Sequence, residues 1–167
     1  MKLASLREGG RDGTLVVVDS TLRRCRRVPE IAPTLQSAID SWQQVAPTLH
    51  AITRTIENDS AANFEDFDPC ACASPLPRAY QFADASAYLN HVVLVRKARG
   101  AEMPANLWTD PLMYQGLSDG FLGPRESIPL IDPDWGPDFE AEIAVVPDGV
   151  PMGTDRRVAG KHIILFM

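Results

Sequence analysis

The sequence has 167 residues, of which 45% are hydrophobic and 23% charged, and its formal net charge is −6. These values are ordinary for a globular chain of one or two small domains, and the negative charge disfavours a general nucleic-acid-binding role. No apolar run approaches the roughly 20 residues of a membrane span, and the charged start of the chain is unlike a signal peptide. The three cysteines (Cys25, Cys70 and Cys72) have no metal-ligand spacing, so we expect reduced thiols in a cytoplasmic protein.

The first 29 residues are predicted to form two or three antiparallel strands. Lys2–Arg7 alternates apolar and polar residues, Thr14–Asp19 is rich in β-branched residues, and Arg23–Val28 alternates again before a proline. The segment 9–13 between the first two runs contains three glycines, which can adopt the positive φ values of tight turns.

Residues 34–58 change to a helical period, with Thr34 as the expected N-cap. Pro47 is expected to end or kink the first helix near Ala46, and it can also open a second helix that ends at 58–60. His50 is interpreted as a surface or packing residue. The apolar positions of the two predicted helices are Leu35, Ala38, Ile39, Trp42, Leu49, Ile52 and Ile56.

Residues 60–78 are predicted to be a connector, because the composition shifts to Ala, Asp and Pro. We place a domain boundary near Pro75. The fold class expected is therefore α+β, with a small N-terminal α/β domain in residues 1–75 and a second domain that starts at residue 76 and continues to residue 167.

The second domain is expected to open with a helix that Asp84 or Ser86 caps and that ends near Arg99, before Gly100. His91 lies in the middle of this helix. Residues 104–123 form a loop rich in glycine and aromatic residues, which either lines a pocket or fills space. Residues 127–131 are predicted to be a short strand and residues 132–137 a turn.

The segment Asp138–Val146 combines apolar patterning with paired charge. In a strand, Glu140 and Glu142 would share one face with Cα atoms roughly 6.5–7 Å apart. Two carboxylates so placed repel each other unless a cation lies between them, and a hard divalent ion is the simplest candidate. An edge strand with a charged, solvated face explains the same pattern.

The chain stops within the apolar run 161–167, which has no terminating turn. An apolar strand at a chain end is unusual for a complete domain, so we expect a truncated chain.

Three stretches occur in a suggestive order: Ser86-Ala87-Tyr88-Leu89-Asn90-His91, Met113-Tyr114-Gln115-Gly116 and Asp138-Phe139-Glu140-Ala141-Glu142. Together they resemble the catalytic domain of the fumarylacetoacetate hydrolase family, and residues 1–75 resemble the small N-terminal domain of its longer bacterial members. The resemblance implies that residues 76–167 are the first part of a mixed β-roll or sandwich domain.

The resemblance also implies a set of site residues. Glu140 and Glu142 match the paired metal ligands of the family, and Asp84 matches a further acidic ligand. His91 matches the histidine that activates water. Tyr114 matches a tyrosine at the substrate pocket, and Ser86 is placed with it as a substrate-binding residue. From the sequence alone, His91 could equally be a helix-surface residue and Tyr114 a packed aromatic residue.

The implied activity is hydrolysis of carbon–carbon bonds in diketo or oxo acids, such as fumarylacetoacetate or acylpyruvates, as in the breakdown of aromatic compounds. It would use Mg²⁺, or else Mn²⁺ or Ca²⁺, with a histidine-activated water and a metal-stabilised enolate. The expected partners are the small acid substrate and a second copy in a homodimer, with no nucleic acid and no membrane. A further aspartate of the family would fall beyond Met167, so we expect this chain to be inactive alone; a non-catalytic remnant used for binding or oligomerisation is the alternative.

Overall fold

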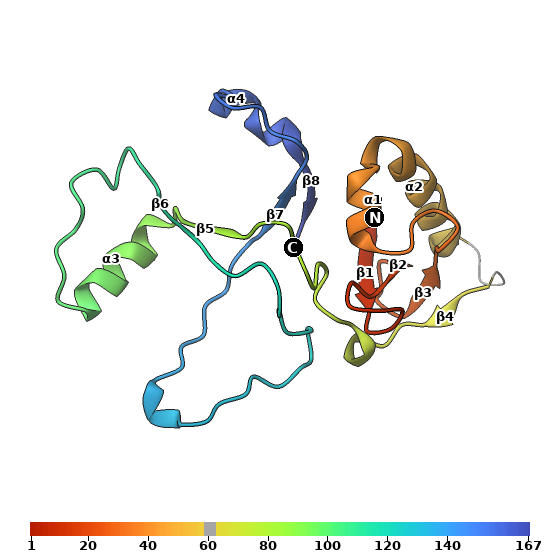
Figure 1. Ribbon diagram of the computed structural model, residues 1–167, viewed down its shortest axis with the longest axis horizontal. Helices are drawn as coiled ribbons and strands as arrows, with labels where there is room; N and C mark the ends of the chain where they lie inside the picture. Colours follow the sequence, from red (N-terminus) through yellow and green to blue (C-terminus); the bar gives the residue numbers. More distant parts are fainter. Residues whose placement is uncertain (59–62) are drawn as a thin grey trace. The chain divides into compact units, whose positions relative to one another are not determined.

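The computed structural model of the protein describes residues 1–58 and 63–167 (Figure 1). The chain divides into two compact units, Met1–Glu126 and Ser127–Met167, which are described separately below. Helices and strands are both present, in agreement with the expected α+β class. Among the described residues, no helix is both long enough and apolar enough to cross a bilayer.

The first unit opens with an antiparallel sheet in the order β1 (Lys2–Leu6), β2 (Thr14–Val18), β3 (Arg24–Arg27) and β4 (Glu65–Asp66). The first three strands confirm the sequence prediction. The short strand β4 lies within the predicted connector, part of which falls outside the described residues. It forms because Glu65 and Asp66 pair with the free edge of β3.

Strand β2 is buried on both faces, which explains its unbroken run of apolar residues. On one face Val16 and Val18 pack in a cluster with three further buried residues, namely Leu6, Cys25 and Cys72. Leu15 and Val17 point to the opposite face, since side chains alternate along a strand, and both are fully buried. Cys25, Cys70 and Cys72 are free thiols, and burial raises the pKa of both Cys25 and Cys72.

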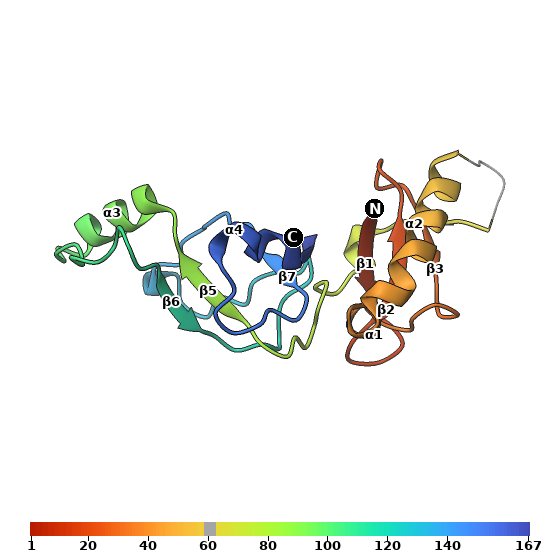
Figure 2. The same cartoon turned by 90° about the horizontal axis from the view of Figure 1, so that it is seen from above.

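Two helices, α1 (Leu35–Asp40) and α2 (Trp42–Asn58), pack against the sheet (Figure 2). Thr34 caps α1 as predicted: its side chain accepts a hydrogen bond from the Ser37 amide, and the Ser37 hydroxyl accepts one from the Thr34 amide. The predicted inner face of the second helix is also confirmed, because Leu49, Ile52 and Ile56 are buried. His50 is exposed, as expected for a surface residue.

The predicted helix end near Ala46 and the predicted helix start at Pro47 are wrong. The break between the helices falls at Ser41, and Pro47 lies inside α2, within its second turn. Proline lacks only its own amide hydrogen, so the helix loses one bond, to the Gln43 carbonyl. Burial of the apolar residues that follow outweighs this loss.

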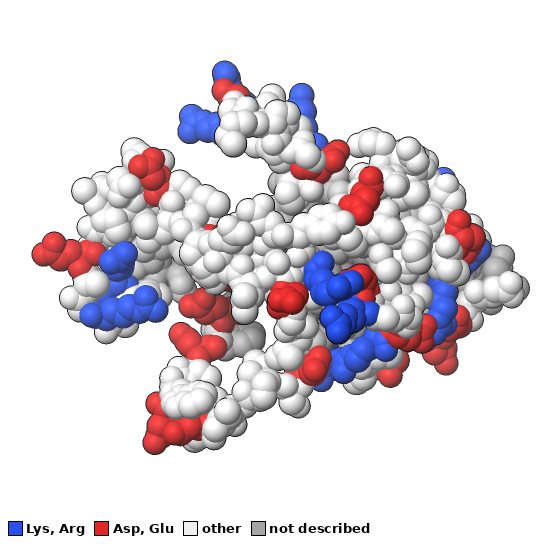
Figure 3. All heavy atoms as spheres, viewed as in Figure 1, with Lys and Arg blue, Asp and Glu red and all other residues white. Residues whose placement is uncertain are grey.

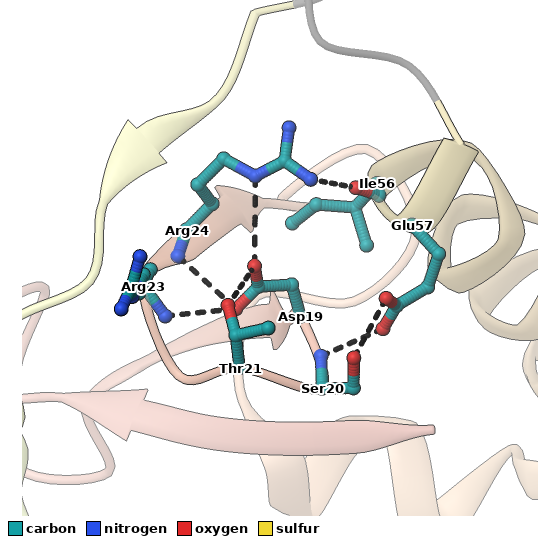
Figure 4. Close-up of polar contacts among 7 residues, drawn as sticks. All are labelled: Asp19, Ser20, Thr21, Arg23, Arg24, Ile56 and Glu57. Atoms are coloured by element: carbon teal, nitrogen blue, oxygen red, sulfur yellow. Dashed lines mark hydrogen bonds and ion pairs between the residues drawn. The ribbon is translucent and has the colours of Figure 1, made fainter.

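A tight turn between β2 and β3 is organised by the buried carboxylate of Asp19 (Figure 4). This carboxylate accepts hydrogen bonds from the Thr21 hydroxyl (2.8 Å) and from the amides of Arg23 (2.8 Å) and Arg24 (3.2 Å). The Arg24 side chain also forms an ion pair with Asp19 and donates to the Ile56 carbonyl near the end of α2. The turn is therefore tied to the C-terminal end of the second helix.

The rest of the first unit contains η1 (Pro69–Ala71), β5 (Ala83–Ser86), α3 (Leu89–Ala98) and β6 (Leu112–Gln115). The prediction that Asp84 or Ser86 caps the helix is wrong, because both lie in β5, and α3 begins only at Leu89. The cap position is Tyr88, which makes no capping hydrogen bond through its side chain. Pairing of β5 with β6 takes these residues out of the helix. Gly100 follows α3 with a φ of 62°, as expected for a helix stop.

The second unit contains a single pair of strands, β7 (Val145–Pro147) and β8 (Ile163–Phe166). Three short helical segments complete it: η2 (Pro133–Trp135), α4 (Arg156–Ala159) and η3 (Gly160–His162). The strand predicted for residues 127–131 is not observed, and the turn at 132–137 is confirmed by η2.

The strand predicted over Asp138–Val146 is observed only at its C-terminal end. Ala144 exchanges two backbone hydrogen bonds with Met167, and none of the residues before Ala144 continues the ladder. A strand is stable where its backbone groups have partners, which explains why the ladder stops here. The described residues thus form one four-stranded and two two-stranded sheets, and the expected β-roll or sandwich is not confirmed.

Candidate metal and substrate site

Three of the predicted site residues lie on one face of the β5–β6 ribbon. In the antiparallel register Asp84 is directly opposite Tyr114, and Ser86 is opposite Leu112. Directly opposite residues project to the same side of a sheet, and so do residues two apart along a strand. Asp84 and Ser86 are half-buried, whereas Tyr114 is 58% exposed. The ribbon therefore carries Asp84, Ser86 and Tyr114 on one of its two faces.

His91 is the third residue of α3, and α3 contacts β5 of the same ribbon. Its side chain is half-buried. The first helical turn follows β5 after only two residues, which keeps His91 within the same compact unit as Asp84 and Tyr114.

Glu140 and Glu142 belong to the second unit, and both are exposed. They lie in a segment without regular secondary structure, so the shared face that an extended strand would give them stays a prediction. The chemistry of the pair nevertheless suits a hard divalent cation, because carboxylate oxygens are the ligands that Mg²⁺ and Ca²⁺ prefer.

No group of three or more His, Cys, Asp or Glu side chains in residues 1–58 and 63–167 is arranged to hold a metal ion. The candidate ligands are divided between the two units, with Asp84 in the first and Glu140 and Glu142 in the second. Within each unit the candidates alone supply too few ligands for the six or more oxygens that such ions take.

On the face shown in Figure 3, basic side chains gather near the middle of the view and lie beside acidic ones. Many are paired in the first unit: Arg26 with Glu30, Arg27 with Glu8, and Arg78 with Asp12.

Sequence reasoning missed Leu112, which shares the polar face of the ribbon with Ser86. It also missed Phe82, whose carbonyl accepts the Gly116 amide at 3.2 Å just beyond β6. Finding either residue would have required recognising β5 as a strand. The short sequence Ala-Asp-Ala-Ser gives little strand signal, because Ala and Asp are depleted in strands.

Comparison with protein families gives a result for the N-terminal part of the chain. Residues 1–78 match the family model described as fumarylacetoacetase N-terminal domain 2. No curated protein matches the chain. The match covers the sheet β1–β4, helices α1 and α2, and η1, and it ends before the ribbon begins. This part of the chain is thus similar to a fumarylacetoacetase N-terminal domain.

Proposed function

We propose that the protein is a metal-dependent hydrolase that cleaves carbon–carbon bonds in small diketo or oxo acids. The observation that carries the proposal is the match of residues 1–78 to a fumarylacetoacetase N-terminal domain. Downstream of that domain, the three stretches that carry His91, Tyr114 and the Glu140–Glu142 pair follow in the order found in the family's catalytic domain.

Glu140 and Glu142, with Asp84, are proposed to hold Mg²⁺, or else Mn²⁺ or Ca²⁺. When bound, the cation would polarise the substrate's ketone oxygens and stabilise the negative charge that develops on cleavage. His91 would accept a proton from the attacking water, because a neutral imidazole can do so near pH 7. Tyr114 and Ser86 would orient the substrate through their hydroxyl groups.

We also propose a cytoplasmic homodimer, with a boundary near Pro75 between the N-terminal and catalytic parts. Support for a protein partner comes from the distribution of exposed apolar residues. Leu22 is the one large hydrophobic residue exposed among the described residues before Tyr80, whereas many are exposed after it. They include Trp108 (74%), Ile131 (84%) and Phe139 (88%). Apolar surface of this extent favours association.

A non-catalytic binding or oligomerisation module is the second candidate. The observation that favours it is the absence, among the described residues, of a complete cluster of metal-binding side chains. Under this proposal, residues 1–78 would carry the function and the exposed apolar residues after Tyr80 would bind another protein chain.

The two candidates differ in a direct assay of substrate cleavage. The protein is produced from its complete coding sequence, purified and incubated with an acylpyruvate and Mg²⁺, and loss of the diketo absorbance is followed. The hydrolase proposal predicts cleavage that EDTA abolishes and that His91→Asn lowers by roughly 100-fold or more, as expected for a general base. His50→Asn, at an exposed histidine of α2, is the matched control and should keep the parent rate. Absence of cleavage with every metal tested would favour the binding module.

A further inference from the structure

Two segments that lie far apart in the sequence form one antiparallel arm. Residues 72–86 and 112–126 run from the N-terminal sheet to the ribbon and pair with each other at several positions. Asp84 lies opposite Tyr114 in the ribbon. Closer to the sheet, the Gly116 amide donates to the Phe82 carbonyl, and an isolated bridge pairs Arg78 with Asp119.

One end of the arm is joined to the free edge of β1. Cys72 forms a bridge with Leu6, and the amides of Arg7 and Ala73 donate to the carbonyls of Ala71 (2.8 Å) and Ser5 (2.9 Å). The Ser5 hydroxyl, which is buried, donates to the Pro75 carbonyl at 2.7 Å. The first segment of the arm thus continues the N-terminal sheet.

The second segment is held at the same place by four residues, which we call the clasp: Arg7, Cys72, Gly123 and Glu126. One nitrogen of the Arg7 guanidinium donates to the Cys72 carbonyl and to the Glu126 carboxylate, each at 3.1 Å. The same carboxylate oxygen accepts the Gly123 amide at 3.0 Å. Charge-assisted bonds of this kind are stronger than neutral ones.

Gly123 is buried in the clasp, and the space around it leaves no room for a larger residue. A Cβ atom on Gly123 would lie 2.4 Å from the Cys72 carbonyl oxygen and 2.8 Å from the Arg7 guanidinium. Both distances are far inside van der Waals contact, so a side chain at this position would push the second segment off the sheet.

The middle of the arm transmits this anchoring to the ribbon. Arg78 forms two hydrogen bonds with the Asp12 carboxylate, at 2.8 and 2.6 Å. The rings of Phe82 and Phe121 pack against each other across the arm in a tilted arrangement, with centroids 5.5 Å apart. Gly116 fits against the Phe82 ring, and a Cβ atom there would lie only 2.9 Å from it. Tyr114 lies only two residues before Gly116 in the sequence.

We propose that the N-terminal domain positions the ribbon through this clasp, so that Arg7, Gly123 and Glu126 are positioning residues for Asp84, Ser86 and Tyr114. A two-stranded ribbon is at best marginally stable by itself, and attachment to a packed sheet supplies the missing support. The role of the ribbon in substrate binding rests on the proposed function, whereas its anchoring by the clasp does not.

Hydrogen–deuterium exchange of the purified protein tests the anchoring without any substrate or metal. In Gly123→Ala and Glu126→Ala we expect the amides of residues 112–116 to exchange roughly tenfold faster than in the parent, while Thr14–Val18 keeps its protection. Glu126→Gln, whose side-chain oxygen can still accept both hydrogen bonds, should restore part of the protection.

Two matched controls are Glu102→Ala, at an exposed acidic residue outside the clasp, and Gly149→Ala, where a Cβ atom meets nothing within 4 Å. If Gly123→Ala also speeds the exchange of Thr14–Val18, the substitution has disturbed the whole domain, and Glu126→Ala becomes the test of the proposal. The Glu126 side chain is 39% exposed and lies outside the core, so its removal should leave the domain folded. Equal exchange of residues 112–116 in Glu126→Ala and Glu102→Ala would overturn the proposal. Faster exchange of residues 112–116 in the clasp variants would support the anchoring even if the protein cleaves no diketo acid. Lack of cleavage would then count only against the proposed function.

Discussion

At the scale of single residues, Asp19 shows how one buried carboxylate can organise a turn. Burial tends to raise its pKa, but hydrogen bonds from the Arg23 amide, the Thr21 hydroxyl and the Arg24 amide and side chain together outweigh burial. They lower the pKa of Asp19 to about 2. Because the folded pKa lies below the unfolded value of roughly 3.9, this stabilisation is present above pH 4 and is lost as the pH falls toward 2.

Replacement of this carboxylate should therefore change the pH dependence of stability. We expect Asp19→Asn to lower the free energy of unfolding by about 2 kcal/mol at pH 7, because the amide cannot match the charged acceptor. The difference from the parent should shrink as the pH is lowered from 4 to 2. Urea unfolding at several pH values measures both quantities. Asp134→Asn, at an exposed aspartate, is the control, and a difference for Asp19→Asn that is independent of pH would contradict this account.

At the scale of elements, helix α2 contains a residue that helices disfavour. Its buried side, formed by Leu49, Ile52 and Ile56, secures the helix against the sheet. Pro47 lies on the exposed side, so its ring meets no neighbour in the core, but its backbone cannot donate a hydrogen bond. The helix therefore tolerates the proline at some cost in stability.

We expect Pro47→Ala to stabilise the protein by about 1–3 kcal/mol, because it restores one helical hydrogen bond and improves helix propensity. Thermal unfolding followed by circular dichroism measures the change. Thr48→Ala, at the next exposed position of the same helix, should change the stability by only a few tenths of a kcal/mol. A lower melting temperature for Pro47→Ala than for the parent would show that the proline stabilises α2 in some way that the helix geometry does not reveal.

At the scale of the whole molecule, the structure of residues 1–78 was easier to predict from the sequence than the structure of the residues after them. Strands β1–β3, the Thr34 cap and the inner face of α2 follow from local patterns, because a packed domain buries what its sequence marks as apolar. Beyond residue 78 the patterns were less decisive. Asp84 and Ser86 look like helix caps in sequence, and only their pairing with a distant strand places them in β5. The clasp joins Arg7 to Glu126, a separation that no local pattern can reveal.

In the candidate site, too, the structure shows some of the predicted features and leaves others as predictions. Pairing of β5 with β6 places Asp84 opposite Tyr114, two residues that the same family resemblance assigns as a metal ligand and a substrate-pocket residue. The arrangement of Glu140 and Glu142 stays a prediction, because a shared face depends on a strand partner for their segment and not on the residues themselves.

Binding of a divalent cation by Glu140 and Glu142 is the central property proposed for this protein. Calorimetric titration with Mn²⁺, repeated with Mg²⁺, measures binding to the parent protein and to Glu140→Gln, Glu142→Gln and the control Glu102→Gln. We expect saturable binding at one site per chain, lost in the first two variants and kept in the control. Binding that survives both substitutions, or no binding to the folded parent, would contradict the proposed metal centre.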